Sequence, residues 1–83
     1  MNIMVTLIKI NKTNEYIEAN YIPEHEPEEG YIKMRLSDHE IVEKKLTPSD
    51  GKVTHPYFVH ARNGLVQVLK EDTIPAKWVV MWY

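Results

Sequence analysis

The chain has 83 residues, of which 43% are hydrophobic and 27% are charged, and its formal net charge is −2. This length makes one small globular domain, 1–83, and the composition argues against disorder. The absence of cysteine excludes disulfides, thiolate metal sites and thiol catalysis, and it favours a reducing, cytoplasmic setting. The slight negative charge argues against a general nucleic-acid binder. The first ten residues lack a basic start, and Thr6 and Lys9 interrupt their apolar run, which argues against a signal peptide or a membrane segment.

Alternating side chains in the first half of the chain predict four strands, over residues 2–10, 15–22, 31–36 and about 40–46. The polar cluster Asn11–Asn14 makes the first two a hairpin. Residues 23–30 hold two prolines and four glutamates. Because proline cannot sit in a central strand and the carboxylates repel one another, this segment is predicted to be an acidic loop.

Residues 55–72 fit two different structures. Asn63-Gly64 lies between apolar runs and is a strong hairpin signal. The competing pattern is one face of a helix, formed by Tyr57, Ala61, Leu65, Val68 and Leu69. Thr54 would cap this helix and Pro56 would lie in its first turn. We favour a helix over 56–70, in which Gly64 costs about 1 kcal/mol and Gly64→Ala is expected to be stabilising.

The terminal segment Trp78–Tyr83 contains both tryptophans and no charged side chain. It predicts a strand held inside a sheet, because a loose end of this composition would aggregate. Alternation gives one face to Trp78, Val80 and Trp82, and the other to Val79, Met81 and Tyr83. Since both faces are apolar, either the sheet is covered on both sides or its exposed side meets a partner.

These segments together predict an α+β fold: a curved, mainly antiparallel sheet of about five strands with one packed helix. The alternative is an all-β small barrel of about seven short strands, which would form if Asn63-Gly64 were a true hairpin turn.

The sequence offers few residues for catalysis or metal binding. The plausible acid–base or metal residues are four histidines: His25, His39, His55 and His60. His25 lies among the glutamates of the acidic loop, which gives the hypothesis of a metal- or ligand-binding domain, although no dedicated metal-site spacing is present. His60 is more simply a partly buried histidine than a catalytic base. Because nucleophile and phosphate-binding motifs are also missing, we expect no enzyme activity, no catalytic or metal residues and no cofactor.

Tyr16, Tyr31, Lys33 and Arg35 share the outward face of their predicted strands. Tyrosine with arginine is typical of protein–protein contact surfaces. Aromatic and basic side chains also stack single-stranded nucleic acid, although the neighbouring glutamates oppose it. The leading hypothesis is therefore a non-enzymatic protein-interaction module, which could self-associate through a sheet edge or the apolar face of the terminal strand. The alternatives are a metal- or ligand-binding domain and a single-stranded nucleic-acid binder.

Overall fold

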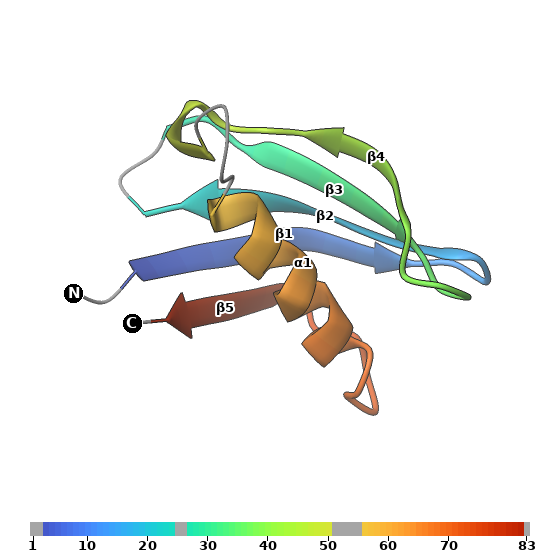
Figure 1. Ribbon diagram of the computed structural model, residues 1–83. Helices are drawn as coiled ribbons and strands as arrows, with labels where there is room; N and C mark the ends of the chain where they lie inside the picture. Colours follow the sequence, from blue (N-terminus) through green and yellow to red (C-terminus); the bar gives the residue numbers. More distant parts are fainter. Residues whose placement is uncertain (1–2, 25–26, 51–55, 83) are drawn as a thin grey trace.

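The computed structural model describes residues 3–24, 27–50 and 56–82, which form an open antiparallel sheet with a helix packed on one face (Figure 1). The strands are β1 (Ile3–Lys12), β2 (Tyr16–Pro23), β3 (Gly30–Arg35), β4 (Ile41–Lys45) and β5 (Lys77–Trp82). A short 3-10 turn, η1 (Pro48–Asp50), precedes the helix α1 (Pro56–Val68). The strand order is β4-β3-β2-β1-β5, so β4 and β5 are the edges of the sheet.

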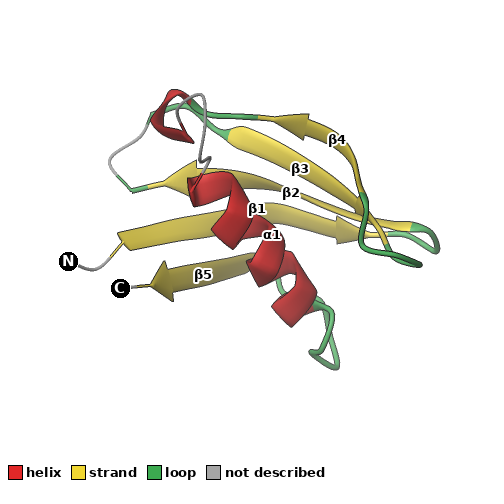
Figure 2. Cartoon of the chain, in the orientation of Figure 1, coloured by secondary structure: helices red, strands yellow, loops and turns green. Residues whose placement is uncertain are grey.

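The predicted α+β fold, with a five-stranded antiparallel sheet and one helix, is confirmed over the described residues (Figure 2). The all-β alternative is wrong, because Asn63-Gly64 lies inside α1 and the sheet is open rather than closed. The helix forms because apolar residues spaced three or four apart are buried against the sheet: Phe58, Ala61, Leu65 and Val68. Tyr57 and Leu69 of the predicted stripe are only partly buried.

Gly64 lies on the side of α1 that faces the sheet. A Cβ at this position would stand 2.5 Å from Cγ2 of Val80 and 3.2 Å from Cδ1 of Leu7. The first distance is far inside van der Waals contact, so the glycine is what allows the helix to lie so close to β5 and β1. This close approach reverses the expectation for Gly64→Ala, because the added methyl group would meet Val80 and Leu7 whatever it contributes to helix propensity.

A bulge in β1 keeps a lysine out of the core. Strict alternation after Val5 and Leu7 would place Lys9 on the buried face. Instead the pairing with β2 shifts at this point, and Lys9 takes a φ of 53° and is exposed. Ile10 then packs against the core in its place. The strand continues to Lys12, two residues beyond its predicted end.

Pro23 is the last residue of β2 and not part of the loop, which corrects the sequence prediction. It is buried and lies opposite Val5 of β1. The backbone N–H of Glu24 donates to the carbonyl of Met4 (3.1 Å), so position 23 points its nitrogen away from β1. On that side no described residue of β3 is paired with it. The missing N–H therefore removes no bond from the sheet.

The terminal strand is oriented as its alternation predicts. Val80 is buried and Trp78 packs against the core, whereas Val79 and Met81 are exposed on the opposite face. The described part of the chain does not include Tyr83 or the side chain of Trp82. It also leaves out Thr54, which was proposed as the N-cap, and His25 and His55, two of the four histidines considered for acid–base chemistry or metal binding. Among the described residues, no helix has the length and the apolar character needed to cross a membrane.

We expect Gly64→Ala to lower the free energy of unfolding by about 1–3 kcal/mol, because the added methyl group must displace Val80 or shift the helix. Chemical denaturation of the variant and the parent protein measures the difference. Asn63→Ala is the matched control, since Asn63 is the exposed neighbour in the same helix and its replacement changes stability by only about 0.5 kcal/mol. A variant at Gly64 as stable as the parent would contradict the packing described above.

Candidate interaction surface

The sheet face opposite α1 is made of alternate residues from all five strands. We name it the open face: Met4, Thr6, Ile8, Tyr16, Glu18, Asn20, Ile22, Tyr31, Lys33, Arg35, Glu43, Lys45, Lys77, Val79 and Met81. The core lies on the other face, between the sheet and α1 (Figure 1). Along the open face, apolar side chains gather on β1 and β5, and polar and aromatic ones on β2, β3 and β4. The two halves differ in chemistry although they belong to one surface.

The polar half brings together the four residues singled out in the sequence. Tyr16 lies directly opposite Arg35 in the β2–β3 pairing. The Nζ of Lys33 stands 4.6 Å from the centre of the Tyr16 ring, a cation–π contact. Tyr31 lies two residues before Lys33 on the same strand and therefore on the same face. The four side chains thus form one continuous group.

Tyr31 is held by a carboxylate that the sequence analysis did not single out as a partner. Its hydroxyl donates to Oε2 of Glu18 over 2.6 Å. Burial, then this hydrogen bond and the nearby Glu43 carboxylate raise the pKa of Tyr31 above its ordinary value. The raised pKa extends to higher pH the range in which the protonated phenol donates to Glu18.

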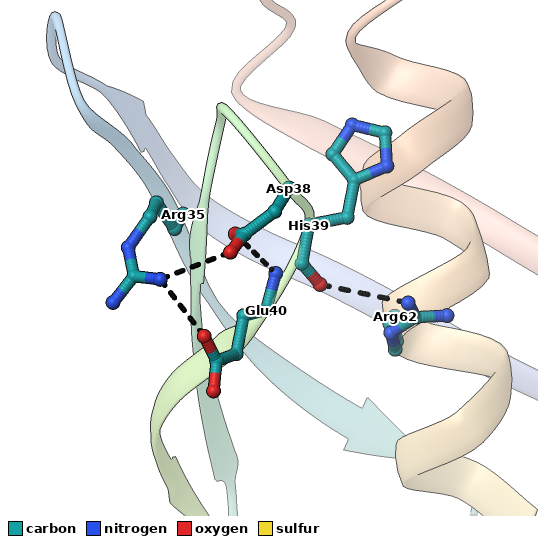
Figure 3. A network of polar contacts seen from close by, with 5 residues as sticks. All are labelled: Arg35, Asp38, His39, Glu40 and Arg62. Carbon is teal, nitrogen blue, oxygen red and sulfur yellow. Dashed lines mark hydrogen bonds and ion pairs between the residues drawn. The ribbon is translucent and has the colours of Figure 1, made fainter.

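Arg35 is the centre of a polar network at the turn between β3 and β4 (Figure 3). Its Nη1 lies 3.0 Å from Oδ2 of Asp38 and 2.8 Å from Oε2 of Glu40. The backbone N–H of Glu40, followed by the Arg35 guanidinium, lowers the pKa of Asp38. Two carboxylates therefore balance the positive charge of this arginine, although all three side chains reach solvent.

The same turn is joined to the helix. Arg62 of α1 donates from Nη2 to the carbonyl of His39 over 3.5 Å (Figure 3). His39 has a φ of 59°, and its backbone N–H donates to the carbonyl of Arg35, so it serves as a turn residue. A shallow hollow of about 260 Å³ lies beside this turn, lined by Asn14, Glu15, Arg35, Leu36 and Ser37. It is smaller than the roughly 300–1,000 Å³ of most ligand pockets.

The apolar half of the open face carries exposed hydrophobic side chains on an edge strand. Val79 is 47% exposed and Met81 is 52% exposed. Their neighbours on β1 are Thr6 and Met4, which are half-buried. Half-buried Ile22 of β2 lies beyond Thr6 in the same row. A row of this kind, beside polar and aromatic residues, has the composition of a contact surface.

The buried polar atoms gather elsewhere, at Asp50. This carboxylate is 1% exposed, and its oxygens accept hydrogen bonds from the Tyr21 hydroxyl (2.7 Å), from the N–H and hydroxyl of Thr47 (3.2 and 2.9 Å), and from the Phe58 N–H (2.8 Å). The last bond satisfies one of the orphan N–H groups in the first turn of α1, the capping role predicted for Thr54. Burial alone would raise the pKa of Asp50, but these hydrogen bonds outweigh it and hold the pKa below its ordinary value.

The Asp50 cluster is suited to structure rather than to chemistry. Four donors occupy its two carboxylate oxygens, and the group has almost no contact with solvent. The histidines give no stronger candidate: His60 is half-buried in α1, and burial lowers its pKa. Within residues 3–24, 27–50 and 56–82, no three histidine or acidic side chains are grouped so that they could hold a metal ion.

The sequence matches no protein-family model, and comparisons with curated proteins and with solved structures gave no significant match. Function is therefore inferred from the side chains themselves.

We expect Asp50→Asn to lower the free energy of unfolding by roughly 2–4 kcal/mol, because an amide has a single accepting oxygen: if it takes the place of Oδ2, which accepts from Tyr21 and Thr47, its NH2 group faces the Phe58 N–H and cannot accept from it. Tyr21→Phe removes one of these bonds and is expected to cost roughly 1–3 kcal/mol. Tyr31→Phe is the matched control: it removes the same kind of bond on the open face, where water can replace the hydroxyl, and should cost less than about 1 kcal/mol. Urea denaturation measures all three variants, and equal losses at Tyr21 and Tyr31 would refute the central place of Asp50.

The same cluster predicts a dependence of stability on pH. The folded pKa of Asp50 is below its unfolded value of about 3.9, so its contribution is present above that pH and is lost as the pH falls through the folded pKa. The difference in stability between the parent and Asp50→Asn should therefore shrink between about pH 5 and pH 2.

Burial and the Asp50 carboxylate raise the pKa of Tyr21, so its contribution is present below about pH 10 and is lost at higher pH. Thermal melts across both ranges test these signs, and a constant difference at acid pH would count against them.

Proposed function

We propose that the chain is a non-enzymatic protein-interaction module and that the open face is its contact surface. One observation supports this above the others: α1 covers one side of the sheet, while the opposite side carries exposed Val79 and Met81 in the same surface as Tyr16, Tyr31 and the basic side chains. An apolar region bordered by tyrosine, lysine and arginine has the composition of a protein interface. A cytoplasmic location belongs to the same proposal, since a chain without cysteine does not depend on an oxidising compartment.

The charges on the open face argue against the nucleic-acid alternative. Lys33 lies between Glu18 on β2 and Glu43 on β4, directly opposite each in the strand pairing. Arg35 is balanced by two carboxylates of its own turn. A phosphate backbone would therefore meet negative charge beside each of these cations. The metal-binding alternative depended on His25, which lies outside the described residues.

Site-specific photo-crosslinking tests this proposal. A benzophenone side chain is placed at Tyr31 on the open face, or as a control at Val59, which is 44% exposed on α1 away from that face. In an extract of the cells in which the protein naturally occurs, we expect the Tyr31 probe to form discrete protein adducts and the Val59 probe to form none. Excess parent protein should suppress the adducts, and excess Lys33→Ala should suppress them less, because it lacks a cation of the surface.

Adducts that form equally from both positions would contradict the proposal, as would adducts at Tyr31 that the parent protein does not displace. Adducts with nucleic acid would favour the alternative binder instead.

A further inference from the structure

The two edges of the sheet are built differently. β4 carries charge at three of its five positions, Glu43, Lys44 and Lys45, and its pairing with β3 is irregular. Both features are devices that prevent an edge strand from pairing with another chain. β5 has a single charged residue, Lys77 at its start, followed by apolar residues, and its pairing with β1 runs without a shift. It contains no proline. One edge is therefore protected and the other is not.

The hydrogen bonds of the sheet identify which backbone groups of β5 point outward. The carbonyl of Met4 faces β2, so its neighbour Val5 faces β5, where it lies opposite Val80. Val80 therefore uses its N–H and C=O inside the sheet. Val79 and Met81, on either side of it, direct theirs away from β1. No described segment pairs with this edge.

We propose that the β5 edge pairs with β5 of a second copy of this chain. The two strands run antiparallel, with Val79 opposite Met81 of the other copy and Val80 at the two-fold axis. This register bonds the outward N–H and C=O groups of Val79 and Met81 in both copies and joins the two sheets into one. The inference goes beyond the proposed function, because it uses the edge of the sheet rather than the open face and holds without any other partner.

The strand itself indicates a second copy as the occupant. In this register the outward N–H and C=O groups of Val79 bond to those of Met81 in the other copy, and those of Met81 bond to Val79. One strand therefore supplies both sides of an isologous contact. Val79 and Met81 are already about half exposed, and pairing brings those of both copies together on the open face. The lysines at position 77 lie at opposite ends of the joined strands, six residues or roughly 20 Å apart. That separation exceeds the screening length of about 8–10 Å, so the like charges do not oppose pairing.

The mass of the protein in solution tests the inference. Light scattering coupled to size exclusion should give twice 9.8 kDa for the parent protein at high concentration. Met81→Lys should give 9.8 kDa, because it places a charge beside its copy at the new junction. Val42→Lys, a similar change at an exposed apolar position on the β4 edge, should remain a dimer. Circular dichroism melts of each variant establish that a monomeric mass belongs to a folded chain.

Single cysteines test the register, since the chain has none of its own. A mixture of Val79→Cys and Met81→Cys proteins should oxidise to a mixed disulfide faster than either protein alone forms its own, because opposite residues lie about 5.5 Å apart and diagonal ones lie farther. A parent mass of 9.8 kDa at all concentrations up to about 1 mM would overturn the inference. A dimer that survives Met81→Lys, or one that Val42→Lys dissociates, would also overturn it. None of these measurements depends on the crosslinking at Tyr31, so the proposed function and this inference can fail separately.

Discussion

The hydrogen bond between the Tyr21 hydroxyl and the Asp50 carboxylate determines where the helix lies on the sheet. Tyr21 belongs to β2, the central strand, and its ring lies over Gly30, where a Cβ would stand 2.2 Å from Cζ of the tyrosine. Asp50 in turn accepts from the N–H of Phe58 in the first turn of α1. The rings of Phe58 and Tyr21 meet edge to face, with centres 6.3 Å apart. A buried carboxylate thus connects the middle of the sheet with the start of the helix.

The position of α1 also decides what the protein presents to its surroundings. The helix lies close to β1 and β5 because Gly64 carries no side chain. The bulge at Lys9 gives β1 an apolar side chain on the covered face beyond Leu7. The described chain has no second helix to cover the other face of the sheet. The open face is a consequence of this asymmetry.

Local pattern was enough to predict what depends on neighbours in the sequence. Alternation gave the strands and the sidedness of Val79 and Val80, and helical spacing outweighed the hairpin signal at Asn63-Gly64. Contacts between distant segments could not be read in this way. Thr47-Pro48-Ser49-Asp50 resembles a capping box, in which the fourth residue accepts from the first, and this pattern could have identified Asp50. Its bond to Tyr21 spans 29 residues of sequence, and no local pattern predicts it. The grouping of the four open-face residues was readable because it needs only strand alternation and one hairpin register.

The contrast between the two edge strands has a physical basis beyond strand propensity. β4 and β5 are the two opposite edge strands of one sheet, and β-branched valine suits either of them. Methionine has no comparable preference for strands, so strand propensity does not explain the exposed Met81 of β5. The corresponding open-face positions of β4 hold the charged residues Glu43 and Lys45. Nor does the core require it, since Val80 and Trp78 provide the buried side of the strand. If the edge pairs with a second copy, the exposed methionine becomes part of an interface, and the stability of the fold depends on protein concentration through mass action. An apolar edge strand is then a recognition element in a domain whose other edge is built to prevent recognition.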